Sequence, residues 1–174
     1  NLIGLNYKSD ELESATTAVE GEIKIFTDAE LKNSTSFNVG TIAPNNGKNT
    51  IAVDNTGNIY VCKSAKGLMA YDTTGNPLWS KEYVTPVSSG NKNNQVDKRE
   101  GYINGVTVKG NYVYVAAGAY GVVILNKADG TEVAHRAVGN LNSANYITVD
   151  NNNNIYVAYG KGRIRVFKLR ATNN

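Results

Sequence analysis

Short apolar segments separated by polar turns run along most of the chain. Within residues 49–83 the segments IAVD, IYVC, GLMAYD and PLWSKEY follow one another, and the turns between them are rich in Gly and Asn. Short apolar runs bounded by such turns predict β-strands joined as antiparallel hairpins. The pattern therefore predicts an all-β chain built from short strands.

This four-segment pattern repeats. It occurs in residues 49–83, 104–138 and 145–169, and the central tyrosines Tyr60, Tyr114 and Tyr156 lie 54 and 42 residues apart. The second interval matches the period of about 40–45 residues that is typical of propeller repeats. The first interval is lengthened by the polar insertion 88–101, which has no apolar periodicity and which we expect to form a surface loop.

The two central strands of a repeat are apolar at nearly every position, as in residues 112–117 and 122–125. Such strands need cover on both faces, which a single sheet cannot provide for itself. Radial stacking of small sheets provides that cover and leaves only short edges exposed. The sequence therefore predicts a β-propeller of four-stranded antiparallel blades, with Trp79 on an outer strand as a possible wedge between blades.

The ends of the chain predict incomplete blades. Segments 2–7, 21–28 and 35–40 resemble the second to fourth strands of a blade, and the last repeat stops after its third strand. The expected organisation is a single propeller domain or propeller fragment over residues 1–174, with a partial blade 1–40, blades 41–84 and 102–139, and a partial blade 140–170. Joining the two partial blades would give six strands, so we expect part of a larger ring, or a half that associates with another copy or chain. A closed four-bladed ring is the alternative.

Composition narrows the classes of protein. Hydrophobic residues make up 41% and charged residues 19%, the net charge is +3 and the mean hydropathy is −0.36. These values fit neither a disordered polymer nor a membrane protein, and no apolar run reaches the roughly 18 residues of a spanning helix. The first residues lack the order of a signal peptide, so any export signal is expected to have been removed already. The basic residues are scattered, which argues against nucleic acid as a partner.

Several segments resemble known repeat families. The stretch 53-VDNTGNIYV-61 looks like the hairpin of NHL and related propellers, and residues 67–79 and 121–133 resemble PQQ-like and LVIVD-type repeats. The likeness covers most of residues 49–169. It implies a propeller fold, but these repeats occur in enzymes and in binding scaffolds alike.

Candidate binding residues lie where propeller loops gather at one face. Asn49, Asn104 and Asn145 take equivalent positions just before the inner strands, so they are expected to circle the channel mouth. Their amides suit sugar hydroxyls, a peptide backbone or a small polar ligand. The alternative is that each amide binds a neighbouring backbone group where its strand begins.

The loops of the same face add basic and aromatic residues to these amides: Lys63, Lys66, Tyr120, Tyr159 and Lys161. A rim of this kind is suited to an acidic or glycan partner. Four acidic residues of the first long loop, Asp10, Glu11, Glu13 and Glu20, are expected on the same face. The rim therefore either neutralises itself or carries ordinary solvated charge.

Other polar residues are expected to be structural. Asp54 and Asp150 open runs that resemble calcium loops, but neither run has the glycine and glutamate spacing of an EF-hand. We expect them to organise hairpin turns. Cys62 is the single cysteine and is expected in the core, and His135 is the single histidine. No metal site, cofactor or catalytic triad is predicted.

The function we expect is a non-enzymatic interaction protein. It would be an extracytoplasmic bacterial propeller, at the cell envelope or secreted, that presents its loops to a protein or glycan. This placement rests on a composition rich in Asn and poor in Cys and on the LVIVD-like repeats, which resemble those of envelope proteins. The alternative is a fragment of a lactonase-like or PQQ-like propeller enzyme. A lactonase-like site needs carboxylates around the channel, and PQQ-like repeats need a tryptophan in each blade.

Overall fold

A computed structural model describes residues 2–7, 19–42, 49–64, 66–88, 96–100, 102–138 and 143–169. For residues 7, 84–88 and 96–100 only the backbone is described. Asp10, Glu11 and Glu13 of the predicted acidic loop lie outside these ranges. In the described ranges all regular structure is β-strand, apart from one 3-10 turn at Gly160–Gly162.

The strands form four antiparallel sheets of three, four, four and three strands, as the repeat pattern predicts, together with one two-stranded ribbon. The first sheet contains β1 (Leu2–Tyr7), β2 (Val19–Phe26) and β3 (Ser34–Ile42), and the second contains β4 (Asn49–Val53), β5 (Ile59–Lys63), β6 (Leu68–Tyr71) and β7 (Pro77–Lys81). The third contains β10 (Gly105–Lys109), β11 (Tyr112–Ala117), β12 (Gly121–Asn126) and β13 (Glu132–Arg136), and the fourth contains β14 (Ala144–Val149), β15 (Asn154–Tyr159) and β16 (Arg163–Lys168).

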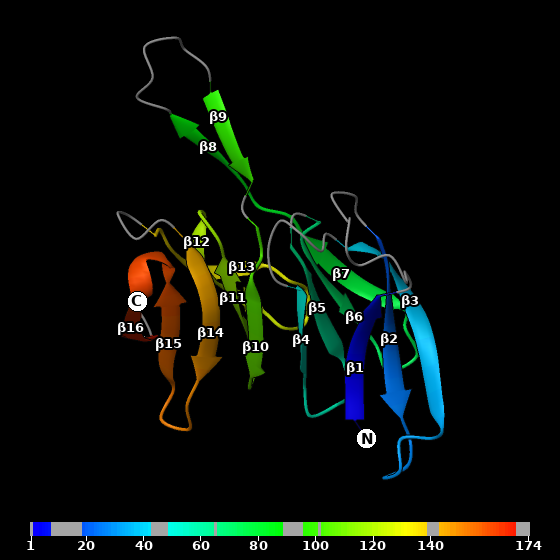
Figure 1. Cartoon of the computed structure of the whole chain (residues 1–174). Coiled ribbons are helices and arrows are strands. Elements are labelled where there is room, and N and C mark those ends of the chain that lie inside the picture. The colour runs from blue at the N-terminus through cyan, green and yellow to red at the C-terminus, as the bar shows by residue number, and fades with distance from the viewer. Residues whose placement is uncertain are drawn as a thin grey trace.

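The four sheets stand side by side like the blades of a propeller, and β4, β10 and β14 lie next to one another as their inner strands (Figure 1). The first and fourth sheets are at opposite ends of the array, and no ladder joins them among the described strands. The part of the chain that the structure describes is therefore an open array of sheets. It contains no helix long and apolar enough to cross a membrane.

Three hydrophobic cores fill the spaces between neighbouring sheets. The first core joins Ile23, Val39 and Ile42 of the first sheet to Ile59, Val61 and Tyr71 of the second. The second core joins Tyr60, Cys62, Leu68 and Ala70 to Val113, Val115, Ala117, Val123 and Leu125. The third core joins Tyr114, Ala116, Val122 and Ile124 to Ala144, Ile147, Ile155, Val157 and Tyr159. Successive residues of β5 and β11 thus enter different cores, which confirms that these central strands are covered on both faces.

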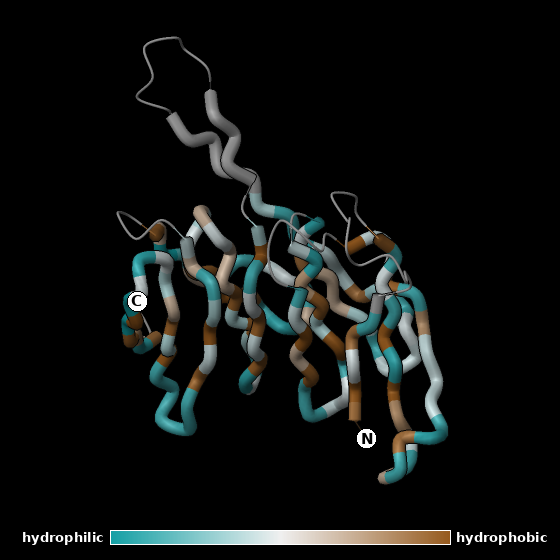
Figure 2. The backbone as a smooth tube through the Cα atoms, in the orientation of Figure 1, coloured by the Kyte–Doolittle hydropathy of each residue, from teal (hydrophilic) through white to brown (hydrophobic). Residues whose placement is uncertain are grey.

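The hairpin turns at the edge opposite to the ribbon are held by aspartates. The Oδ1 atom of Asp54 accepts hydrogen bonds from the backbone N–H groups of Thr56 and Asn58, and its Oδ2 atom accepts from the Tyr60 hydroxyl at 3.1 Å. Asp150 makes the same set with Asn152, Asn154 and Tyr156. The prediction that these aspartates organise turns rather than calcium loops is confirmed, and Figure 2 shows these turns as hydrophilic.

Part of the predicted surface loop at 88–101 is instead a strand. β8 (Val84–Ser88) pairs antiparallel with β9 (Val96–Glu100), and this ribbon projects away from the four sheets (Figure 1). The sequence VDKRE of β9 contains a single apolar residue, so hydrophobic alternation carries no signal for it. The ladder rests on backbone hydrogen bonds, which composition does not reveal.

Candidate functional site

The loop edge is the edge of the array from which the connections β5–β6, β11–β12 and β15–β16 emerge, together with the starts of β4, β10 and β14. Strands alternate in direction, so these connections necessarily lie at one edge, and the β8–β9 ribbon rises from the same edge (Figure 1). Backbone hydrogen bonds tie neighbouring sheets together here. Ile103 N–H donates to Ser64 O at 3.2 Å, and Ala144 N–H donates to Gly118 O at 2.8 Å.

Two of the three predicted asparagines meet at this edge. The Asn104 side-chain amide donates to the Ala144 carbonyl at 3.0 Å and approaches Asn145 Oδ1 at 3.4 Å. The Ser143 hydroxyl donates to the same Asn145 oxygen at 2.7 Å. Asn104 is buried, with 7% of its surface exposed. Its amide N–H groups therefore join the third and fourth sheets, and Asn145 is the more accessible of the pair.

Asn49 begins β4 and lies opposite Lys63 on β5. Lys63 is half-buried, and its Nζ donates to the Val39 carbonyl at 2.7 Å. Burial lowers the pKa of Lys63, because an ammonium group is less well solvated there. This lysine thus connects the second sheet to the first, while Lys66, three residues later, is exposed on the turn.

Tyr120 belongs to an aromatic stack that sequence reasoning missed. Its ring lies parallel to that of His135, with 4.2 Å between centroids and 13° between planes, and it also contacts Tyr83 at 4.8 Å. His135 Nε2 lies 2.8 Å from the Tyr120 carbonyl oxygen. Burial raises the pKa of Tyr83 and Tyr120 above the ordinary tyrosine value. The three rings come from three separate segments, so no local sequence signal links them.

Tyr159 and Lys161 lie close in sequence but differ in exposure. Tyr159 is 5% exposed and packs in the core between the third and fourth sheets, rather than forming part of an open rim. Lys161 is exposed on the 3-10 turn and has a positive φ of 64°. The exposed cations at the described part of the loop edge thus include Lys66 and Lys161.

The other polar residues considered above are held by hydrogen bonds or buried in the core. Glu20, the described member of the predicted acidic group, accepts a hydrogen bond from Asn38 Nδ2 at 2.8 Å. Cys62 is buried as predicted, and burial raises its pKa to about 12. Within the described ranges, no group of three or more His, Cys, Asp or Glu residues could hold a metal ion.

Comparison with known proteins identifies the fold. The structure resembles that of the computationally designed Ika4 protein with a TM-score of 0.57 and 11% identity, over 88% of this chain and 86% of that one. It resembles that of BamB from Moraxella catarrhalis with a TM-score of 0.57 and 15% identity, over 84% of this chain and 40% of that one. At these identities the likeness shows the fold alone, which is a β-propeller.

No family model and no curated protein matches the sequence. The resemblance to LVIVD, NHL and PQQ-like repeats therefore stays a prediction. The chain spans less than half of the length of BamB.

Proposed function

We propose that this chain is a non-enzymatic binding scaffold that presents its loop edge to a glycan or protein partner outside the cytoplasm. One observation carries the proposal. The accessible candidate residues and the projecting β8–β9 ribbon share one edge of a rigid sheet array. Loops set on a rigid framework are the usual place for recognition. The Asn-rich, Cys-poor composition supports the extracytoplasmic placement.

The loop edge supplies a specific chemistry. Lys66 and Lys161 are exposed cations, Asn145 is a partly accessible amide, and Tyr120 presents part of an aromatic stack. Amides and aromatic faces bind sugar rings and hydroxyls, and ammonium groups bind carboxylate or sulfate substituents. We therefore infer that, among glycans, acidic ones bind best.

Binding to a glycan array that includes sulfated and uronic acid oligosaccharides tests this proposal. The double variant Lys66→Ala/Lys161→Ala should bind acidic glycans at least about fivefold more weakly, and binding by the wild type should weaken with added salt. Lys32→Ala is the matched control, because Lys32 lies in the β2–β3 turn at the opposite edge. No binding by the wild type, or equal binding by the double variant, would contradict the glycan function.

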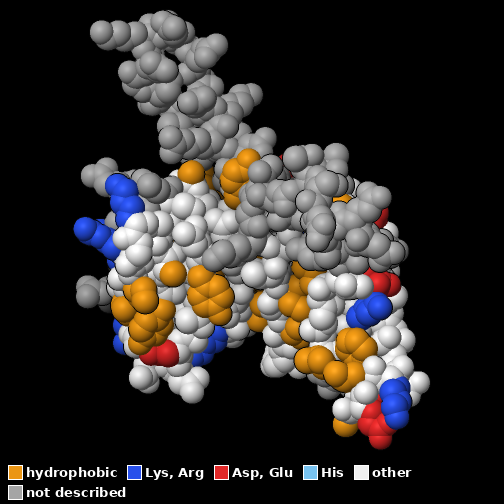
Figure 3. All heavy atoms as spheres, viewed as in Figure 1, with side chains coloured by type: hydrophobic (Ala, Val, Ile, Leu, Met, Phe, Trp, Pro, Cys, Tyr) orange, Lys and Arg blue, Asp and Glu red, His pale blue; other side chains and the backbone are white. Residues whose placement is uncertain are grey.

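We also propose that the open array is completed by another sheet, from a second copy or from the remainder of the same polypeptide. The outer face of the fourth sheet supports this. Tyr146, Ile164 and Val166 are 53%, 73% and 55% exposed, and Figure 3 shows hydrophobic side chains gathered over this sheet. Light scattering of the purified chain at rising concentration separates the two sources. A dimer that Ile164→Lys converts to monomer supports a second copy, and a monomer throughout rejects that source.

A further inference from the structure

Aromatic rings close the first two junctions between sheets. Phe37 on β3 packs on Tyr71, with 5.4 Å between centroids, and also covers Gly75 in the next sheet. Trp79 on β7 packs on Tyr60 at 5.8 Å and covers Gly130 in the sheet after that. A Cβ atom placed on Gly75 or Gly130 would lie 2.5 Å or 2.7 Å from the covering ring. In both junctions a ring from an outer strand therefore fills the space beside the next β-turn.

At the third junction the described residues include no ring at the corresponding position. Trp79 pairs with Ala70 on β6, and the strand register shifts directly after that pair. Ala134 pairs with Ile124 on β12, and the register shifts at the same point. Ala134 therefore takes the position in the third sheet that Trp79 takes in the second.

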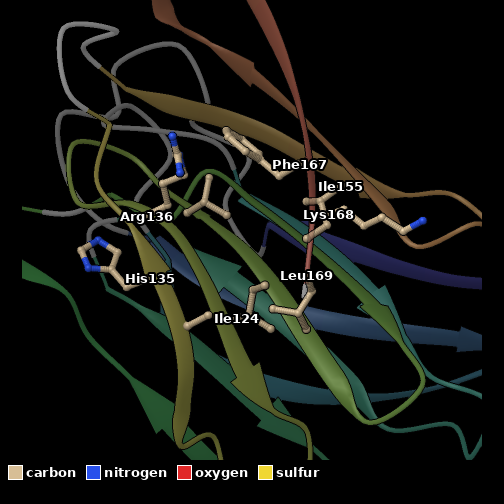
Figure 4. Close-up of a pocket in the computed structure, with 9 residues that line it drawn as sticks. Ile124, His135, Arg136, Ile155, Phe167, Lys168 and Leu169 are labelled. Atoms are coloured by element: carbon tan, nitrogen blue, oxygen red, sulfur yellow. The ribbon is translucent and has the colours of Figure 1, made fainter. Parts of the chain in front are cut away.

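A pocket of about 140 Å³ lies beside Ala134. Its apolar lining comes from both sheets of the third junction: Val122, Ile124, Ala134, Ile155, Phe167 and Leu169. Figure 4 shows Ile124 and Leu169 at one end of the pocket and the Phe167 ring at the other. An engineered apolar cavity of about 150 Å³ binds benzene, so this volume suits one small aromatic ring system.

One cation lies beside Phe167 at this pocket (Figure 4). The Arg136 guanidinium lies over the Phe167 ring, with its carbon 5.0 Å from the ring centroid. No ion pair among the described residues involves Arg136. Lys168 extends away from the pocket in Figure 4, and the His135 ring stacks on Tyr120 instead. The pocket thus combines an apolar slot with a single guanidinium, which pairs well with a planar carboxylate.

We propose that this pocket binds a small aromatic carboxylate. The aromatic ring of the ligand occupies the space beside Ala134, which corresponds to the space that Trp79 fills at the second junction. The carboxylate of the ligand pairs with Arg136. This site goes beyond the proposed scaffold function, because it lies between the third and fourth sheets and uses none of the exposed lysines of the loop edge.

Indole-3-acetate is a suitable probe, and binding is measured by NMR titration of the labelled protein. For a ligand of this size and typical efficiency we expect a Kd of roughly 0.1–1 mM. The amide shifts should change on the strands that line the pocket, β12, β13, β15 and β16. Neutral indole should bind about five- to tenfold more weakly, because it lacks the carboxylate that Arg136 pairs with.

Ala134→Trp is the decisive variant, because it places in the pocket the ring that the second junction already has. It should weaken indole-3-acetate binding at least about tenfold and raise the Tm by roughly 2–4 °C as the pocket fills. Val133→Trp is the matched control. It makes the same kind of change one residue earlier at a position that is 48% exposed, and binding should be retained.

Arg136→Gln provides a second test that does not alter the apolar lining. It should weaken indole-3-acetate binding about fivefold or more and leave indole binding unchanged. The proposal is overturned if the wild type does not bind the probe below 5 mM, a concentration of about five times the weakest expected Kd. It is also overturned if the shifts fall outside the four strands that line the pocket, β12, β13, β15 and β16, or if Arg136→Gln weakens both probes equally.

Discussion

The third and fourth sheets carry the same pattern of side chains on corresponding faces but bury it to very different extents. In the third sheet Tyr114 pairs with Ile124, and Ala116 pairs with Val122. In the fourth sheet Tyr156 pairs with Val166, and Ala158 pairs with Ile164. These eight residues therefore form two equivalent patches on two consecutive sheets.

The patch of the third sheet is core, and that of the fourth is surface. Ile124 and Val122 are each 5% exposed, whereas Val166 and Ile164 are 55% and 73% exposed. The exposure differs because of the neighbouring sheet. The fourth sheet covers the patch of the third sheet, whereas the described chain places no sheet over the patch of the fourth sheet. The side-chain pattern thus specifies a sheet face that is able to pack in a core. Whether that face is buried depends on the presence of a neighbouring sheet.

Removing equal apolar volume from the two patches gives the largest expected effect. Ile124→Ala should lower the free energy of unfolding by about 3 kcal/mol, because it leaves a cavity in the third core. Ile164→Ala makes the same change on the exposed patch and should alter stability by less than about 0.5 kcal/mol.

Urea unfolding of the two variants measures this difference. Equal losses would mean that the fourth patch is covered in solution, which would favour the completed array. The same comparison in dilute and concentrated protein shows whether a second copy provides that cover.

The fold was largely predictable from sequence, because each repeat places its apolar residues on two faces of the central strands. Tyr60, Tyr114 and Tyr156 marked the repeats correctly, and Trp79 is the wedge that the pattern suggested. Its Nε1 donates to the Lys127 carbonyl of the next sheet at 3.0 Å. The apolar central strands and their tyrosines are local in sequence and recur in each repeat. The sequence therefore shows the same pattern several times, which makes the fold predictable.

The sites were less predictable, because they depend on contacts between sheets. Asn104 and Asn145 were expected at the channel mouth, with binding to a neighbouring backbone group as the alternative. Asn104 is buried, and its amide donates to the Ala144 carbonyl of the neighbouring sheet. The pocket beside Ala134 follows from strand register, which a sequence does not fix. The β8–β9 ribbon was missed because its pairing depends on backbone hydrogen bonds rather than on apolar residues.

A turn glycine from each of the two sheets gives a second comparison, with a smaller expected effect on stability. Gly130 in the third sheet and Gly162 in the fourth have similar positive φ values, 69° and 64°. A Cβ atom on Gly130 would meet the Trp79 ring, whereas one on Gly162 would meet nothing within 4 Å. Gly130→Ala should therefore cost about 2 kcal/mol of stability, from backbone strain and displacement of the ring together.

Gly162→Ala should cost only the backbone strain, about 1 kcal/mol. Thermal unfolding of both variants checks this order, and tryptophan fluorescence should change for Gly130→Ala alone, since Trp79 is the single tryptophan. A larger loss for Gly162→Ala would show that the turn of the fourth sheet is covered by something that the described chain does not contain.

The aspartates of the β4–β5 and β14–β15 turns give the smallest expected difference in stability, and this difference is tested by changing the pH. Hydrogen bonds from the Asn154 side chain and backbone lower the pKa of Asp150 to about 2. Partial burial by itself raises the pKa of Asp54, but hydrogen bonds from Thr56 and Asn58 and the nearby Lys127 outweigh it, so the pKa lies well below its ordinary value. Lys127 Nζ is 3.3 Å from Asp54 Oδ2 and links the third sheet to the second.

Because both folded-state pKa values lie below the unfolded value of 3.8, both carboxylates stabilise the fold above about pH 4 and lose this effect as the pH falls toward 2 and below. Asp54→Asn should cost about 1 kcal/mol at pH 7, and this cost should shrink in acid and in high salt. The Asp150 carboxylate makes no ion pair among the described residues, although the Lys109 ammonium binds the Asp150 backbone carbonyl. The cost of Asp150→Asn should therefore shrink in acid and depend less on salt than that of Asp54→Asn. Equal salt dependence of the two variants would show that Lys127 does not stabilise the junction between the second and third sheets.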